Sequence, residues 1–370
     1  MLDVGDGACS VLRERSDVGD GLDRTAVIDC GSRPRRGELA ARLLAAHLTP
    51  QDWRSLSQLV VTHFDADHWE GLLHVVNRIP SDSCTVPPDL CIYFPAVPFY
   101  VNPRLPEGLM TFITAVGPYG VQPLDLRAAW RRVTRVHMRP VAKGDSFPLA
   151  DRLHEVVWPP ARLTGRATQR LNTLVQRIEE EAAQLARLGY PQLQNSLREA
   201  YENGPYNRHP ARDDGPSYDI PEFELPAFAA NEYQETQSSL SGNSTDTVIP
   251  KERARSREFR NLVKRARAAQ NDLSLVFHDP ARASLLVFGD APAAVVERVC
   301  PDLRADGYQV ALAPHHGSRQ LWSGAPNAET CISQYGTGLR QFWPNHTGSH
   351  FNSGNCINTY DSGDIDCDLL

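Results

Sequence analysis

The sequence predicts an α+β fold that is interrupted by a mostly helical and irregular insertion. Two observations support the α+β class. "ACSVLRER" and "TAVIDCGS" read as one strand hairpin, and "DLSLVFHD" and "ASLLVFGD" as another near the far end. The run "WEGLLHVVNRI" has the apolar spacing of an amphipathic helix and follows the buried strand "LSQLVVTH". A third observation, a change in character near residue 161, predicts the insertion. A chain of 370 residues is long enough for one large domain with an insertion, or for two domains.

The composition along the chain predicts four segments. Residues 1–160 would form the first part of the domain and residues 271–350 its second part. The intervening insertion, 161–270, holds a long amphipathic helix, a polar segment rich in Pro, Gly and Ser, and a basic helix at 251–270. The polar segment, 203–250, is expected to be a long loop or partly disordered. Residues 351–370 would be a polar C-terminal tail.

Charge and cysteine usage restrict the class of protein. The net charge of -7 excludes a global basic footprint for nucleic acid, although it permits a local patch. The chain has no apolar run long enough to span a membrane, and its start lacks the features of a signal peptide. The eight cysteines form no CxxC pair, as in proteins that keep their thiols reduced. We therefore expect a cytoplasmic protein. A disulfide or second metal site in the tail is an alternative that no ligand spacing supports.

Three strand ends carry imidazoles and carboxylates. The first is "THFDADH", where four such side chains occupy six positions. The second is Asp290, which ends "LLVFGD", and the third is the pair His315 and His316 in "APHHGS". Nitrogen and oxygen donors that arrive together suit borderline or hard divalent ions, and a single carboxylate can bridge two of them. The sequence thus predicts a two-metal site.

Simpler explanations exist for each residue. The first cluster could be a polar loop that caps the next helix, with Asp67 as the N-cap, and Asp290 could cap a helix in the same way. His315 and His316 are neighbours, and neighbouring residues on a strand point to opposite faces. We expect at least one of the two to be a ligand, because the chain can turn at a strand end.

The ordered motifs resemble those of the metallo-β-lactamase superfamily. "THFDADH" resembles its HxHxDH signature, in the HxDxDH form of the metallohydrolase domain of the competence protein ComEC. "LDVGDGA", "VIDCGS", "VVWPP", "NDLSLVF", "LLVFGD" and "APHHGS" resemble further family motifs and occur in the family's order. The resemblance covers roughly residues 1–160 and 270–320. The chain departs from the pattern at Asp6 and Ala8, and it lacks an evident equivalent of a histidine that many members place before the bridging Asp.

The resemblance implies an αββα four-layer sandwich with a dinuclear site at one edge. His63 and Asp65 would bind one ion, Asp67 and His68 the other, and Asp290 would bridge them. His315 or His316 would complete the ligand set. The ions would be Zn²⁺ or Mn²⁺, because Asp65 is a harder ligand than histidine. The family's nucleophile would be a metal-bridging hydroxide, which assigns catalytic roles to Asp67, His68 and Asp290.

The resemblance further implies a phosphodiesterase or nuclease that acts on nucleic acid. The alternatives are a hydrolase of a small ester, lactone, thioester or lactam, and a partner-binding component with a structural metal site. Further residues are expected around the ions. Substrate-binding candidates are Ser318, His346, Lys264 and Arg265. Residues expected to brace the site by hydrogen bonds are Asp3, Asp29 and Asn271.

Two partners are predicted. The basic helix at 251–270 would bind a nucleic-acid backbone, although a solvated surface is the default reading of a charge run. The insertion at 161–270 would bind a protein partner, as in a component of a larger system for DNA uptake or defence.

Overall fold

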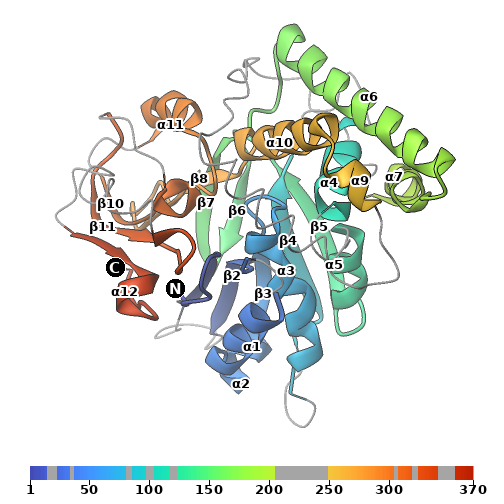
Figure 1. Cartoon of the computed structure of the whole chain (residues 1–370). Helices are drawn as coiled ribbons and strands as arrows, with labels where there is room; N and C mark the ends of the chain where they lie inside the picture. Colours follow the sequence, from blue (N-terminus) through green and yellow to red (C-terminus); the bar gives the residue numbers. More distant parts are fainter. Residues whose placement is uncertain are drawn as a thin grey trace.

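Two β-sheets form the centre of the computed structural model of the chain (Figure 1). The structure describes residues 1–14, 23–33, 37–80, 86–96, 104–116, 123–204, 249–303, 307–318, 324–340 and 355–369. Most of the predicted polar segment at 203–250 lies outside these ranges.

The first sheet has the strand order β1-β2-β3-β4-β5. Its strands are β1 (Cys9–Glu14), β2 (Arg24–Cys30), β3 (Leu56–Val60), β4 (Asp89–Pro95) and β5 (Arg135–Val141). Strands β1 and β2 form the antiparallel hairpin expected from the sequence, and the remaining pairs are parallel. Parallel neighbours end at the same edge, so the segment after β3 lies at a sheet edge together with the segment after β2.

The second sheet has the order β12-β11-β10-β9-β8-β7-β6. Its strands are β6 (Ser146–Leu149), β7 (Arg152–Trp158), β8 (Val276–His278), β9 (Leu285–Val287), β10 (Tyr308–Leu312), β11 (Ala328–Ser333) and β12 (Asn355–Asn358). Strands β9 to β12 are parallel, whereas β6 to β9 are antiparallel. The parallel part brings the ends of β9 and β10 together.

Helices cover the outer face of each sheet. On the first sheet these are α1 (Gly37–His47), α2 (Pro50–Ser55), α3 (Ala66–Val75) with the 3₁₀ turn η1 (Val76–Arg78), and α5 (Pro123–Trp130). The second sheet is followed by α11 (Ala293–Val299) and the 3₁₀ turns η3 (Cys300–Asp302) and η4 (Pro314–Gly317). Helix α2 begins with a capping box between Thr49 and Asp52.

The sheets pack face to face. On β2 and β3, Ile28 and Val60 belong to the core between the sheets, together with Phe277 and Val287 of the second sheet. The alternate residues of β2 and β3 belong to the core under the helices. This alternation follows from the two-residue period of a strand, and it separates one core between the sheets from another beneath the helices. The predicted αββα sandwich is therefore confirmed.

The insertion packs on the same domain rather than beside it. Its helices are α6 (Gly165–Arg187), α7 (Gln192–Asn203), α9 (Lys251–Ala254) and α10 (Arg257–Asp272). Of these, α6, α7 and α10 contact α4 (Leu105–Ala115). Phe259 of α10 meets Phe112 of α4 edge to face, with ring centroids 6.1 Å apart. The predicted basic helix at 251–270 is divided, because Ser256 leaves the helical conformation and its hydroxyl accepts the backbone N–H of Phe259 as an N-cap.

The predicted polar tail differs from what the structure shows. Strand β12 pairs in parallel with β11 as the edge of the second sheet, and α12 (Thr359–Ser362) follows it. The backbone N–H of Ile365 donates to the carbonyl of Met1 at 2.9 Å. Residues 355–369 are thus an integral part of the sandwich, which the polar composition of the segment did not indicate. Among the described residues, no helix has the length and apolarity that crossing a membrane requires.

Candidate metal centre

The first motif lies at the junction between β3 and α3. Helix α3 begins at Ala66, and its N-cap is Asp65, whose side chain makes no capping hydrogen bond. Asp67 and His68 lie in the first helical turn and are both 2% exposed. The explanation of this motif as a capped helix start therefore fails, since the carboxylate of the N-cap residue does not cap and Asp67 lies inside the helix. The polar side chains of this junction are directed toward other strand ends.

The second sheet supplies the remaining side chains. Asp290 follows β9, and His315 and His316 follow β10 in the turn η4. Both histidines have left-handed backbone conformations, with φ of 51° and 58°. Such conformations are strained for residues other than glycine and cluster at functional sites. The turn brings two neighbouring side chains to one site, whereas an extended strand would direct them to opposite faces.

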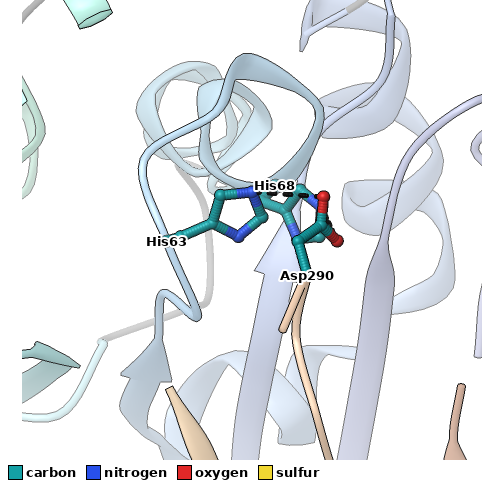
Figure 2. Close-up of side chains that lie close together, drawn as sticks. All are labelled: His63, His68 and Asp290. Carbon is teal, nitrogen blue, oxygen red and sulfur yellow. Dashed lines mark ion pairs between the residues drawn. The ribbon is translucent and has the colours of Figure 1, made fainter. Parts of the chain in front are cut away.

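Asp290 stands between two groups of ligands. Its Oδ2 lies 3.5 Å from the Nε2 atoms of both His63 and His315. Its Oδ1 lies 3.2 Å from Nε2 of His68 and 3.9 Å from Nε2 of His316. Figure 2 shows His63 and His68 close to the Asp290 carboxylate. Each carboxylate oxygen therefore faces two imidazoles.

The two carboxylates of the first motif complete these groups. Asp65 Oδ2 lies 3.9 Å from His63 Nε2, and Asp67 Oδ2 lies 3.3 Å from His316 Nε2. We call the two groups half-site A and half-site B. Half-site A consists of His63, Asp65, His315 and Oδ2 of Asp290. Half-site B consists of Asp67, His68, His316 and Oδ1 of Asp290. The sequence left open which of His315 and His316 joins the site, and the structure brings in both, one for each half-site.

Neighbouring groups hold the histidine rings. His68 Nδ1 donates to Asp29 Oδ2 at 2.8 Å, and His316 Nδ1 donates to the carbonyl of Gln334 at the same distance. His315 Nδ1 is hydrogen-bonded to the hydroxyl of Ser318. In each ring the hydrogen bond at Nδ1 directs Nε2 toward the site, which is how second-sphere partners orient metal-binding histidines.

Arg33 binds a carboxylate of the site, and the sequence pattern did not predict this contact. Its Nε donates to Asp67 Oδ2 at 2.6 Å, and the side chain of Arg33 is 17% exposed. Burial would raise the pKa of Asp67, but the Arg33 guanidinium and the imidazoles of His316 and His68 hold that pKa well below its usual range. Asp67 is therefore an anion at neutral pH. "DCGSR" gave no signal of this contact, because Arg33 lies 34 residues before its partner.

The charges of Asp290 and His68 strongly shift each other's pKa values. Burial opposes the charge on Asp290, but the imidazoles of His315, His68 and His63 keep its pKa well below its usual range. Burial likewise disfavours a charged His68, yet the carboxylates of Asp290 and Asp29 raise its pKa well above the usual value. A metal ion that binds Nε2 of His68 must displace a proton, so metal affinity falls as the pH is lowered.

The residues present fit divalent metal ions. His63 Nε2 and both carboxylate oxygens of Asp290 are buried without hydrogen-bond partners in the part of the chain that the structure describes. Two sets of donor atoms lie within 4.8 Å of one another: His63, His68 and Asp290, and Asp67, His68 and His316. Four carboxylates are buried here, at Asp29, Asp65, Asp67 and Asp290. Buried carboxylates need compensating positive charge, which Arg33 supplies only in part and two divalent ions would complete. Imidazole and carboxylate donors suit Zn²⁺ and Mn²⁺.

The other predicted residues are placed as follows. Ser318, expected to bind substrate, instead holds the ring of His315 and donates to that residue's carbonyl at 2.7 Å. Asp3 accepts the backbone N–H of Gly5 at 3.1 Å, which places it in the opening loop rather than beside a ligand.

The remaining predicted residues lie on or near α10, or outside the described chain. Asn271 is buried near the end of α10, and its Oδ1 has no hydrogen-bond partner within the described ranges. Lys264 and Arg265 are partly buried on the same helix. His346 lies outside the described residues.

Asp6 has a bracing role that the sequence did not reveal. Its carboxylate accepts the backbone N–H groups of Gly336, Gly338 and Leu339 at 2.9 to 3.1 Å. It thereby links the opening loop to the loop after β11, close to Gln334. Position 6 departs from the family motif, but the carboxylate of Asp6 accepts hydrogen bonds from three backbone N–H groups of the neighbouring loop.

Comparison with known proteins agrees with the fold and the site. Residues 3–146 match the family model of the metallo-beta-lactamase superfamily. Residues 3–146 are thus similar to a superfamily whose members are mostly metal-dependent hydrolases. No curated protein matches the chain. The matched range holds the first motif, Asp29 and Arg33, whereas Asp290, His315 and His316 come from the later part of the chain. The fold, the domain match and the ligand geometry together support a metal-dependent hydrolase.

Proposed function

We propose that the protein is a phosphodiesterase or nuclease that uses two divalent ions. The observation that carries the proposal is the position of Asp290, with one carboxylate oxygen in each half-site. When bound, two ions a few ångströms apart lower the pKa of water and stabilise the attacking and leaving oxygens of a displacement at phosphorus. This arrangement suits a phosphodiester, because the attacking oxygen and the leaving oxygen both carry charge in the transition state.

The side chains of this chain would hold that arrangement rigidly. Asp29, Gln334 and Ser318 fix the rings of His68, His316 and His315, which keeps every Nε2 atom directed at the centre. Arg33 holds Asp67 in its anionic form. Because each ligand residue as a whole, backbone included, is at most 8% exposed, bulk water has little access to the centre. A pre-organised, largely dry site strengthens electrostatic stabilisation of the transition state.

The basic helix favours a polyanionic substrate. Helix α10 buries one face against α4 and α6 and leaves positive charges on its other faces, with Arg257 exposed and Arg260, Lys264 and Arg265 partly buried. Its C-terminal end leads directly to the metal centre, since the backbone N–H of Leu275 donates to the carbonyl of Thr62 at 2.8 Å. A phosphate backbone is the class of ligand that such a surface attracts. The protein partner predicted for the insertion stays a prediction.

A substrate panel tests the proposal. The metal-loaded protein is assayed with bis(4-nitrophenyl) phosphate, single-stranded and plasmid DNA, 4-nitrophenyl acetate and nitrocefin, with Mn²⁺ or Zn²⁺. We expect hydrolysis of the phosphodiesters, its loss in Asp67→Ala and Asp290→Ala, and wild-type rates in the control Asp302→Ala. The control removes an exposed carboxylate that pairs with Lys143 on the surface. Hydrolysis of the neutral ester or the lactam alone would instead support the small-substrate class. Full activity in Asp290→Ala would contradict the proposal.

A further inference from the structure

The segment that follows the insertion is packed against two of the strand ends that carry ligands of half-site A, those of β3 and β9. Leu275, just after α10, is bonded to Thr62, which precedes His63. Gly289 precedes Asp290, and a Cβ at Gly289 would lie 3.0 Å from the Cβ of Thr62 and 3.3 Å from the Cβ of Ser274. The segment after α10 therefore touches both ligand-bearing segments. Figure 1 shows α10 leading from the insertion toward β8.

Arg267, on the last turns of α10, has hydrogen-bonding capacity that the described residues do not use. The side chain is partly buried, and its Nε is fully enclosed without a hydrogen-bond partner in the described ranges. A buried guanidinium N–H that forms no bond is costly, so such groups usually have a partner, either within the protein or in a ligand. Arg33 differs in this respect, because its Nε is bound to Asp67 at 2.6 Å.

Arg267 also lies close to the metal centre. Burial raises the pKa of Asp65, and Arg267 opposes this rise more than any other charged group, ahead of His63. The guanidinium is nevertheless beyond ion-pair distance from the Asp65 carboxylate. The arginine thus stands near half-site A without forming an ion pair with Asp65.

The open side of the centre is the side of Asp65. The side chain of Asp65 is 12% exposed, whereas those of His63 and Asp290 are 1% exposed and that of His315 is 6% exposed. In half-site B the side chains of Asp67 and His68 are 3% exposed and that of His316 is 1% exposed. A substrate would consequently approach over Asp65, beside Arg267.

We propose that Arg267 is a substrate-binding residue that donates to an anionic oxygen of a phosphodiester held at the metal centre. This proposal rests on the proposed function and adds that the insertion supplies part of the substrate site. Arginine suits the role, because its planar donors match two phosphate oxygens and it stays charged at all relevant pH values. Lys264 and Arg265, expected from the sequence to bind substrate, would then serve the more distant backbone of a polymer.

Binding of inorganic phosphate tests the proposal without requiring turnover. The melting temperature of the metal-loaded protein is measured over a phosphate titration for wild type, Arg267→Ala, Arg267→Lys and the control Arg170→Ala, which removes a partly buried arginine of helix α6 in the same insertion. We expect phosphate affinity to fall about 10- to 100-fold in Arg267→Ala, as for loss of a charge-assisted hydrogen bond. We expect a smaller fall in Arg267→Lys and a change below about twofold in Arg170→Ala. Arg267→Lys also serves if Arg267→Ala does not fold.

Kinetics with two substrates separate binding from a general structural effect. Arg267→Ala should raise KM for bis(4-nitrophenyl) phosphate and for an oligodeoxynucleotide, while any activity on neutral 4-nitrophenyl acetate and the metal content remain at wild-type levels. Equal phosphate affinity in wild type and Arg267→Ala would overturn the assignment of Arg267, even if wild type hydrolyses phosphodiesters. Selective loss of phosphate affinity in a protein that hydrolyses no phosphodiester would keep the anion site and overturn the proposed function instead.

Discussion

Glu70 allows a quantitative prediction about burial in α3, directly behind the metal centre. The residue is 2% exposed, and its Oε2 has no hydrogen-bond partner among the described residues. Burial, reinforced by the charge of Asp67, raises the pKa of Glu70 to about 9. The carboxyl group is therefore neutral in the folded protein at pH 7, whereas in the unfolded chain it is ionised. Replacement with glutamine keeps the shape and the neutral state.

The sign of the pH effect follows from proton linkage. The folded state holds a proton that the unfolded state loses above pH 4.5, so the free energy of unfolding decreases as the pH rises from 4.5 to 9. Each pH unit within this window corresponds to about 1.4 kcal/mol, which gives an upper limit of about 4 kcal/mol between pH 5 and pH 8. Glu70→Gln removes this dependence. The variant should therefore gain stability over wild type as the pH rises.

Urea unfolding at pH 5 and pH 8 measures the effect, with wild type and variant at the same metal concentration. We expect a small difference between them at pH 5 and a gain of up to about 4 kcal/mol for Glu70→Gln at pH 8. Glu38→Gln, on the neighbouring helix α1 and exposed, is the control and should follow wild type. A difference between Glu70→Gln and wild type that does not change with pH would refute the account of Glu70 as a neutral buried acid.

Three further predictions concern the metal centre. Ser318→Ala removes the partner of His315 Nδ1 and should weaken metal binding by about 10- to 100-fold, as found for second-sphere partners. The affinity is measured by competition with a chromophoric chelator. Unchanged affinity would show that the hydroxyl does not orient the ring. Asp29→Asn removes the acceptor of His68 Nδ1 and should weaken metal binding by a similar factor in the same competition assay. Wild-type metal affinity together with wild-type activity in this variant would contradict the role given to Asp29. Metal affinity itself should fall steeply as the pH is lowered, because His68 must lose a proton to bind the metal. The protons released on metal addition can be counted in weakly buffered solution. A pH-independent affinity would contradict the assignment of His68 as a ligand.

The sequence predicted the layers of the fold well, because the strands have clear apolar runs and the motifs occur in an order typical of one superfamily. It predicted the tail poorly. The polar composition of residues 355–369 hides an edge strand, whose pairing depends on β11 and not on its own hydrophobicity. The break at Ser256 was also missed, since a single N-cap serine inside a basic helical run carries little weight.

The structure brings together all four first-motif residues that the sequence predicted, but the sequence did not indicate how the later residues divide between the two half-sites. The left-handed turn at His315 and His316 cannot be read from "APHHGS", and it decides that both rings reach Asp290. Arg33 and Gln334 were missed, because their contacts join residues far apart in the chain and use a guanidinium and a backbone carbonyl. Arg267 could be listed only as one of many charges on a basic helix. Its place near Asp65 depends on how the insertion returns to β8.

Metal stoichiometry tests the central claim most directly, namely that Asp290 joins two half-sites. Elemental analysis of protein loaded with Zn²⁺ or Mn²⁺ and freed of excess metal should give about two ions per chain for wild type. Asp290→Ala, which removes the shared carboxylate, should retain less than one ion, whereas Asp302→Ala should retain the wild-type content. A wild-type protein that holds no divalent ion, or an Asp290→Ala variant that retains both, would contradict the account.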